Sequence, residues 1–240
     1  MRKDSEGYQL WETPKGHFWV PTTESLWTVS YVLAEQECKI YGSGKAGVRS
    51  GDIVLDCGAN VGMYTREALN AGAKLVVAIE PSPRNIKCLH QNLKTEVEQG
   101  RVIIYKKGVW NREKILTFST SETESSGLDT FVLRLKDAHT ISVPVTTIDK
   151  IVKELKLDRV DFIKMDIEGS EENALLGAQE TIAVYGPRIA LSLEHVADHE
   201  KEINRMLNIV KSAYPGYQTQ CGDCGITREG ILYPQVLFFH

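Results

Sequence analysis

The turn that follows an apolar run at residues 53–55 has residue types suited to holding a cofactor. The run is typical of a buried parallel strand, and after it come four residues in the spacing D-x-G-x-N-x-G: Asp56, Gly58, Asn60 and Gly62. Such a turn lets backbone N–H groups approach a ligand beside a helix N-terminus, expected here over residues 63–71. The spacing differs from the G-x-G-x-x-G that binds a dinucleotide pyrophosphate. An acid at the strand end repels phosphate and attracts an amino group, so the pattern favours S-adenosylmethionine, and a side chain at Gly58 would occupy ligand space.

A second acid, Glu80, follows the next apolar strand, over residues 75–79. A carboxylate at the carboxyl end of such a strand accepts hydrogen bonds from both ribose hydroxyls of a bound cofactor, and in dinucleotide-binding proteins it follows the glycine turn by roughly 20 residues. Glu80 follows Gly62 by a similar interval. The alternative is that Glu80 only caps the helix expected from Arg84 to about Thr95.

Acids also follow two later strands. The segment DFIKMDIEGSE places Asp166 and Glu168 after one strand, and IALSLEH places Glu194 and His195 after another. Alternate strand residues face the same side, so Asp166 and Glu168 share a side, which Lys164 joins if the strand stays regular to its end. A hydrophobic core excludes charges that are neither paired nor bound to a ligand. We therefore expect these side chains at a ligand site.

The chemistry expected at this edge is proton transfer. Candidate catalytic residues are Asp166, Glu194 and His195, with Glu194 or His195 as the base that takes a proton from the acceptor, and Asp166 is also a candidate for cofactor binding. The same three residues could instead hold a divalent cation that acidifies a substrate hydroxyl. The metal is not favoured, because such carboxylates also bind a cofactor's amino group or cap helices.

Four motifs in this order resemble the FkbM-type S-adenosylmethionine-dependent methyltransferases: GDIVLDCGANVGMYT at 51–65, IEPSP at 79–83, VTTID at 145–149, and IKMDIEGSE at 163–171 followed by LLGA at 175–178. The resemblance covers about residues 48–195. It implies an α/β fold of the Rossmann-like class I methyltransferase type, with a mostly parallel sheet, helices on both faces and an antiparallel C-terminal strand. It also implies methylation of hydroxyl groups on sugars, polyketides and related small molecules, although a fold does not determine its substrate.

Two parts are expected along the chain: an N-terminal hairpin and helix cap over residues 1–47, and a methyltransferase domain over residues 48–240 with a β insertion at about 112–146. The cap's tryptophans, Trp11, Trp19 and Trp27, either anchor it on the core, as aromatic residues most often do, or line the mouth of the cofactor site. A polar loop at 120–127 either contacts substrate or is a solvated excursion. Further strands are expected at 114–119, 141–145, 160–165, 217–220 and 236–239, and helices at 22–37, 147–155, 171–183 and 201–212.

Composition narrows the function classes. The 240 residues carry a net charge of −4 and have a pI near 5.9, so a broad nucleic-acid-binding face is not expected. No apolar run approaches the roughly 20 residues of a membrane span, and the charged N-terminus lacks the apolar centre of a signal peptide. We therefore expect a cytoplasmic enzyme with a small-molecule acceptor. The five cysteines are scattered, which argues against a secreted disulfide framework.

Several alternatives remain open. Cys221 and Cys224 lie in CGDCG, for which a tight turn is favoured over a redox pair, and one pair of thiols does not make a zinc site. The favoured reaction is O-methylation of a small molecule or sugar. The alternatives are methylation of a protein or nucleoside nitrogen, hydride transfer by an NAD-dependent oxidoreductase, and cofactor binding without catalysis by a scaffold protein. The sequence does not specify the oligomeric state.

Overall fold

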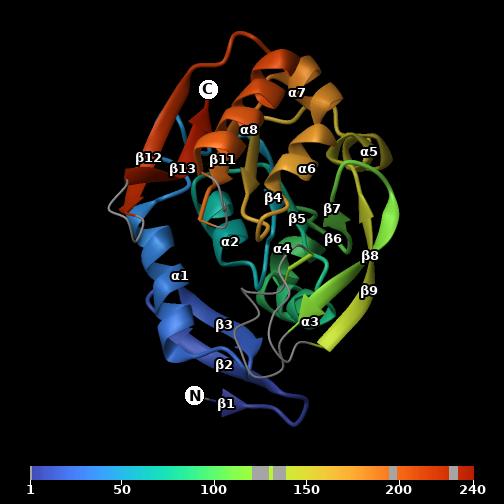
Figure 1. Ribbon diagram of the computed structural model, residues 1–240. Coiled ribbons are helices and arrows are strands. Elements are labelled where there is room, and N and C mark those ends of the chain that lie inside the picture. Colours follow the sequence, from blue (N-terminus) through green and yellow to red (C-terminus); the bar gives the residue numbers. More distant parts are fainter. Residues whose placement is uncertain (1, 121–129, 132–138, 195–198, 227–231) are drawn as a thin grey trace.

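A seven-stranded sheet forms the centre of the computed structural model, which describes residues 2–120, 130–131, 139–194, 199–226 and 232–240 (Figure 1). Its strand order is β12-β13-β11-β10-β4-β5-β6. Five adjacent strands run parallel: β6 (Val102–Tyr105), β5 (Leu75–Ile79), β4 (Ile53–Cys57), β10 (Phe162–Met165) and β11 (Arg188–Ser192). The last strand, β13 (Leu232–Phe239), runs antiparallel between β11 and β12 (Thr219–Ile226). This arrangement confirms the α/β, Rossmann-like class I methyltransferase fold with its antiparallel C-terminal strand.

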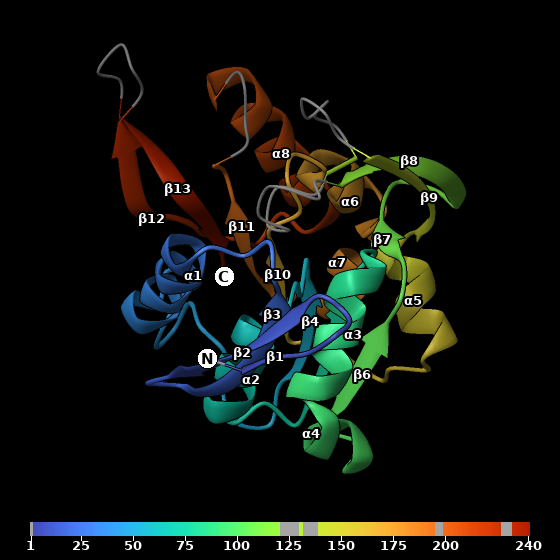
Figure 2. The ribbon, with the colours of Figure 1, turned by 90° about the horizontal axis from the view of Figure 1, so that it is seen from below.

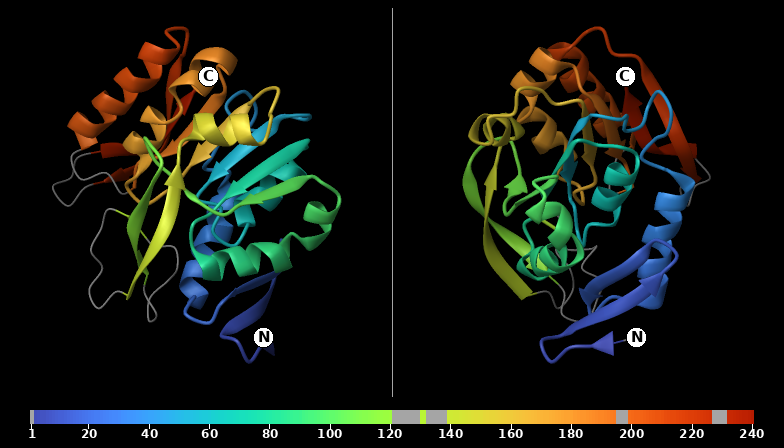
Figure 3. Two further views of the ribbon diagram at one scale, coloured as in Figure 1. Left: turned by 90° about the vertical axis from the view of Figure 1, so that its right-hand side faces the viewer. Right: turned by 180° about the vertical axis from the view of Figure 1, so that it is seen from behind.

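Helices cover both faces of the sheet, as Figure 3 shows from two sides. Successive side chains of a strand point to opposite faces of the sheet, so each buried strand contributes to both layers. In β4, Leu55 packs in one core cluster and Val54 in the other. The Leu55 side is covered by α5 (Ile148–Glu154), α6 (Glu171–Leu176), α7 (Gln179–Tyr185) and α8 (His199–Ala213). The Val54 side is covered by α2 (Met63–Asn70), α3 (Pro83–Asn92) and α4 (Lys94–Glu98).

Two helices expected as continuous are each divided. The segment 171–183 forms α6 and α7, which separate at Gly177, where a Cβ would lie 2.1 Å from the Trp110 carbonyl oxygen. The close approach of the two backbones accounts for the break. The segment 84–95 forms α3 and α4, separated at the fully buried Leu93, whose backbone is non-helical at φ −120° and ψ 23°.

The N-terminal segment forms the expected hairpin and helix, with one additional short strand. The strands β1 (Arg2–Lys3), β2 (Tyr8–Thr13) and β3 (Gly16–Pro21) pair antiparallel, and α1 (Leu26–Cys38) follows. Figure 2 shows the hairpin beside α3. Asn92 of α3 fixes it there, because its side-chain amide exchanges hydrogen bonds with the backbone of Trp19 at 2.6 and 2.9 Å. Asn92 also donates to the Val61 carbonyl in the turn after β4, so the hairpin lies beside the carboxyl edge of the central sheet.

The β insertion forms a separate small sheet. Strands β8 (Lys114–Thr120) and β9 (His139–Thr146) are antiparallel, and β7 (Gly108–Val109) pairs parallel with β9. Most of the polar loop at 120–127 lies outside the described residues. The CGDCG segment is not the tight turn that was favoured for Cys221 and Cys224: residues 221–225 belong to β12, which pairs with β13, so backbone pairing determines their conformation. In the described part of the chain, no helix has the length and apolar character to cross a membrane.

Candidate cofactor and active site

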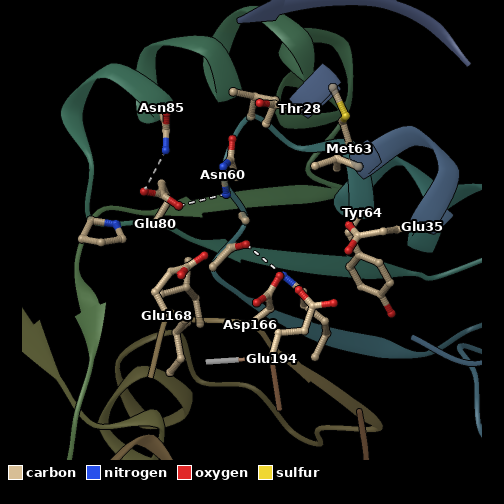
Figure 4. Close-up of a pocket in the computed structure, with 18 of the residues that line it drawn as sticks. Thr28, Glu35, Asn60, Met63, Tyr64, Glu80, Asn85, Asp166, Glu168 and Glu194 are labelled. Atoms are coloured by element: carbon tan, nitrogen blue, oxygen red, sulfur yellow. Dashed lines mark hydrogen bonds and ion pairs between the residues drawn. The ribbon is translucent and has the colours of Figure 1, made fainter. Parts of the chain in front are cut away.

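A cavity of about 460 Å³ opens where the carboxyl ends of β4, β5 and β10 meet. Its lining comes from parts of the chain far apart in sequence: the turn after β4, the ends of β5, β10 and β11, the small sheet, and the N-terminal helix α1. Figure 4 shows Glu80 and Asn85 on one side of this cavity and Glu35 on the other, with Asp166 and Glu194 between them. The structure thus brings together the acids that the sequence placed at separate strand ends.

The turn after β4 has the expected backbone but not the expected use of its N–H groups. Gly58, Asn60 and Gly62 all have positive φ, at 83°, 49° and 93°. Their N–H groups donate within the protein, Gly58 to the Ile79 carbonyl, Asn60 to Glu80 and Gly62 to the Ala59 carbonyl. These N–H groups thus join the turn to β5 and close it on itself. Asn60, like Gly58, lines the cavity, and the roles of Gly58, Asn60 and Gly62 in binding a cofactor stay predictions.

Close packing explains the two glycines of this turn. A Cβ at Gly58 would lie 1.9 Å from the Asp166 carbonyl oxygen, so the end of β10, rather than a ligand, occupies the space that a side chain would need. Gly58 itself lines the cavity. A Cβ at Gly62 would lie 2.9 Å from Leu93, and Gly62 is absent from the cavity lining. The tight fit of α2 against α3 and the following residues thus explains Gly62.

Asp56 is fully buried behind the cavity wall and is not among the lining residues. Its carboxylate accepts a hydrogen bond from Thr65 at 2.6 Å and lies 3.5 Å from the Lys164 ammonium. Burial raises the pKa of Asp56, while Lys164 and Thr65 oppose the rise. A direct contact between Asp56 and a cofactor stays a prediction, and in this structure its partner is a lysine.

Glu80 lines the cavity and is 5% exposed. One carboxylate oxygen accepts from the Asn60 N–H at 2.9 Å, and the other accepts from the Ser82 N–H at 2.9 Å and from the Asn85 amide at 3.4 Å. Because Ser82 is the N-cap residue of α3, Glu80 also stabilises the start of this helix, which agrees with the alternative interpretation of Glu80 as a helix cap. It also presents a buried carboxylate to the cavity.

Asn85 is a lining residue that the sequence analysis missed. It is 2% exposed, and its Oδ1 has no hydrogen-bond partner among the residues that the structure describes. A buried acceptor without a donor is unfavourable unless a ligand or water satisfies it. Its place in the first turn of the helix after the IEPSP motif is a sequence signal that could have identified it.

Opposite Glu80, α1 contributes a second residue that sequence reasoning missed. Glu35 lines the cavity, and burial, followed by the charges of Asp166 and Glu194, raises its pKa to about 8. Asp166 accepts a hydrogen bond from the Tyr41 hydroxyl at 2.8 Å, and Glu194 accepts one from the Tyr31 hydroxyl at 3.2 Å. Three carboxyl groups, one from α1 and two from the residues that follow β10 and β11, therefore share one end of the cavity.

Glu168 adds a fourth carboxyl group in an unusual backbone conformation. Its φ is 55°, and burial, with the nearby charges of Asp166 and Glu171, raises its pKa to about 10. The Lys164 ammonium lies on the same side, 3.7 Å from the Asp166 carboxylate. The cavity thus has a markedly acidic wall around one buried ammonium.

A family model described as the methyltransferase FkbM domain matches residues 56–222 of the chain. The chain belongs to this family. The match includes the strand ends and the cavity walls contributed by β4, β5, β10 and β11, but not α1. The FkbM methyltransferase domain therefore carries the Glu80 side of the cavity, while Glu35 comes from a segment outside the matched residues.

Solved structures similar to the FkbM domain show the same fold. Methyltransferase FkbM from Methylobacillus flagellatus KT has a TM-score of 0.60 at 24% identity, over 82% of this chain and 46% of that one. Trm5b from Pyrococcus abyssi has a TM-score of 0.54 at 12% identity, over 99% and 57%. The M. jannaschii TYW2 structure, a complex with AdoMet, has a TM-score of 0.50 at 15% identity, over 100% and 86%. The chain spans about half the length of the first two, and no curated protein matches it.

Three further candidates from the sequence are His195, Cys221 and Cys224. His195 lies outside the described residues, so its roles as a base or metal ligand stay predictions. Within the described ranges, no group of three His, Cys, Asp or Glu side chains is arranged to hold a metal ion. Cys221 is an exposed free thiol on β12, and the side chain of Cys224 is not described.

Proposed function

We propose that this FkbM domain is an S-adenosylmethionine-dependent methyltransferase that methylates a hydroxyl group of a small molecule or sugar. The observation that carries the proposal is the pair Glu80 and Asn85 at one end of the cavity. Glu80 offers a buried carboxylate, and Asn85 offers an amide oxygen that no described residue satisfies. Two buried acceptors side by side suit the paired donor hydroxyls of a ribose.

The same geometry disfavours a nicotinamide dinucleotide. A pyrophosphate is held by free backbone N–H groups at a glycine turn and helix N-terminus. In this turn the N–H groups of Gly58, Ala59, Asn60 and Gly62 are already donated to protein acceptors. The acidic wall around Asp166 and Glu168 would also repel phosphate, whereas a cofactor with an ammonium and a sulfonium complements it.

The residues of this chain have three tasks in such a reaction. The cofactor supplies a methyl group already activated by its sulfonium. The protein must then orient the acceptor hydroxyl, exclude water and remove the hydroxyl proton. We assign proton removal to a carboxylate oxygen of Glu194, or to His195, and orientation of the acceptor to Asp166, whose carboxylate is itself oriented by Tyr41.

We assign choice of acceptor to the N-terminal segment over residues 1–47. From α1, Trp27, Thr28, Tyr31 and Glu35 line the cavity. Trp11 and Trp19 pack beside the core cluster around Phe18, whereas Trp27 is 73% exposed. Trp11 and Trp19 therefore fit the interpretation that the tryptophans anchor the N-terminal segment on the core, whereas Trp27 lines the cavity.

Methyl transfer is tested with S-adenosylmethionine carrying a deuterated methyl group, added with the enzyme to a cell extract. We expect one class of small molecules to gain the labelled methyl. Once that acceptor is purified, Asp166→Asn and Glu194→Gln should each lower turnover by roughly 100-fold or more, with little change in cofactor affinity. Glu172→Gln is the control, because Glu172 pairs with Arg205 away from the cavity.

Unchanged turnover in both variants would remove these carboxylates from the chemistry. A chelator separates the two mechanisms, since activity that survives it excludes an essential cation and leaves Glu194 or His195 as the base. Activity lost to the chelator and restored by magnesium would favour the metal instead.

A further inference from the structure

An apolar wall of the cavity joins α1 to the turn after β4. Its side chains belong to one core cluster and all line the cavity: Val20 of β3, Val29 of α1, Val61 of the turn and Met63 of α2. Thr28, which also lines the cavity, has its hydroxyl 2.9 Å from that of Ser25, so this polar group already has a partner. In Figure 4, Thr28 and Met63 lie on the side of the cavity away from Glu80. Because a polar group buried without a partner is unfavourable, this wall favours a ligand group with few polar atoms.

Two stacked aromatic side chains of α1 line the same cavity. Trp27 and Tyr31, one helical turn apart, have ring centroids 5.2 Å apart and planes 15° apart. Trp27 is 73% exposed and Tyr31 is 40% exposed, so the pair presents aromatic surface that the protein itself does not bury. A flat aromatic ring that stacks on such a surface gains both apolar burial and a ring–ring interaction.

Tyr31 also connects this aromatic pair to the group assigned to proton removal. Its hydroxyl donates a hydrogen bond to Oε1 of Glu194 at 3.2 Å. A ligand ring that lies against the pair is therefore close to the carboxylate that would take the proton of its hydroxyl group.

A sugar ring suits this surface less well than an aromatic ring does. A pyranose has hydroxyl groups around its edge, and each loses hydrogen bonds to water unless the protein replaces them. Valine and methionine side chains of the wall cannot replace them. An aromatic ring with a single hydroxyl has only that group to satisfy, and the Glu194 carboxylate can accept its proton.

We propose that the Trp27–Tyr31 pair and the adjoining apolar wall bind an aromatic ring of the methyl acceptor. The acceptor is then a phenol or a benzyl-type alcohol rather than a sugar, and Trp27 is a specificity-determining residue. This inference rests on the proposed function and narrows its substrate class. The other aromatic ring in the reaction is the adenine of the cofactor, which is bonded to the ribose proposed at Glu80, and competition with the cofactor product distinguishes the two rings.

Three uncharged alcohols test the subsite: benzyl alcohol, cyclohexylmethanol and methyl glucoside. Each is titrated by NMR into the full chain, with and without saturating S-adenosylhomocysteine. We expect benzyl alcohol to bind about three- to tenfold more tightly than cyclohexylmethanol, which corresponds to the contribution of one aromatic pair, and methyl glucoside to bind least. Saturation with S-adenosylhomocysteine should leave the binding of benzyl alcohol in place.

Two neighbouring substitutions on α1 locate the binding. Trp27→Leu keeps an apolar side chain but removes the ring, so it should lower the affinity for benzyl alcohol to that for cyclohexylmethanol. The indole N–H resonance that this variant lacks belongs to Trp27, and it should shift when benzyl alcohol is added to the wild type. Leu26→Ala is the matched control, because Leu26 is 65% exposed and is not among the lining residues. It should leave all three affinities unchanged.

The proposal is overturned if cyclohexylmethanol or methyl glucoside binds as tightly as benzyl alcohol, if none of the three binds, or if Trp27→Leu behaves like Leu26→Ala. Displacement of benzyl alcohol by S-adenosylhomocysteine would also overturn it, because the aromatic pair would then belong to the adenine site. Failure of the proposed function gives a different result, namely no binding of S-adenosylhomocysteine. Because the alcohols are also titrated without it, the two failures are distinguishable.

Discussion

Lys164 and Asp56 occupy paired positions on the neighbouring strands β10 and β4, and the lysine Nζ lies 3.5 Å from the aspartate Oδ1. Both side chains are almost fully buried, and Nζ also donates to the Gly58 carbonyl at 3.0 Å. Burial lowers the pKa of Lys164, but Asp166 and Asp56 more than offset this, so its pKa is raised overall. This lysine therefore joins the acid at the end of β4 to the glycine turn and to Asp166.

Lys164→Met should strongly destabilise the fold, because it leaves Asp56 as an uncompensated buried charge. The expected loss is about 3 to 5 kcal/mol of unfolding free energy, measured by urea denaturation. Lys94→Met is the control, since the Lys94 side chain is 75% exposed and pairs with Glu98, and it should change stability by less than about 0.5 kcal/mol. Equal effects of the two substitutions would show that the buried pair is not structural.

Gly58→Ala and Gly51→Ala separate backbone strain from a backbone collision. Both glycines have positive φ, at 83° and 88°, but a Cβ at Gly51 has nothing within 4 Å. Gly51→Ala should cost about 1 to 2 kcal/mol from the left-handed conformation alone. Gly58→Ala adds the contact with the Asp166 carbonyl, so its unfolding midpoint should fall much further. A cost equal to that of Gly51→Ala would mean that the ends of β4 and β10 separate easily.

Asn85→Ala should weaken S-adenosylhomocysteine binding by about 1 kcal/mol, since it removes one neutral hydrogen-bond acceptor. Asn70→Ala serves as the control, because Asn70 lies at the exposed end of α2, where its side chain donates to Glu67. Calorimetric dissociation constants are compared at one pH and ionic strength. If the two variants bind equally, the Asn85 oxygen does not contact the cofactor.

Glu35 should make stability pH-dependent. Its pKa in the folded protein is raised to about 8 by burial and by Asp166 and Glu194, from an ordinary value of 4.5. The folded state thus keeps a proton that the unfolded chain has lost, and stability from this group is complete below the ordinary value and is lost as pH rises through about 8. The unfolding free energy of the wild type should therefore fall, relative to Glu35→Gln, between pH 4.5 and about 8. A difference between the two proteins that is the same at both ends of this range would contradict the assignment.

The sequence was sufficient for the fold and for one half of the site. The apolar runs and the acids after them located β4, β5, β10 and β11, since a parallel strand buried on both faces has a distinctive composition. Glu80, Asp166 and Glu194 were found because strand ends meet at one edge of a sheet. No local pattern, however, distinguishes an acid that faces a cavity from one that pairs with a buried lysine, which is why Asp56 and Glu80 looked alike.

The other half of the site required tertiary structure. Glu35 belongs to a helix whose sequence gives no sign that it stands over the end of β10, and Asn85 is defined by an oxygen that lacks a partner after folding. The reason for Gly58 was also inaccessible, because the atom that a side chain would meet belongs to Asp166, about a hundred residues later. These three features depend on contacts between residues far apart in the sequence, and secondary-structure propensity carries no information about such contacts.

Calorimetric titration of S-adenosylhomocysteine and NADH into the wild type and Glu80→Ala tests the central claim most directly. We predict binding of S-adenosylhomocysteine but not NADH to the wild type, and a loss of about 1 to 3 kcal/mol in Glu80→Ala, from removal of a charged acceptor of the ribose hydroxyls. Glu98→Ala, on an exposed turn of α4, should bind as the wild type does. Binding of NADH in place of S-adenosylhomocysteine, or equal affinity of the Glu80 variant and the wild type, would contradict the account.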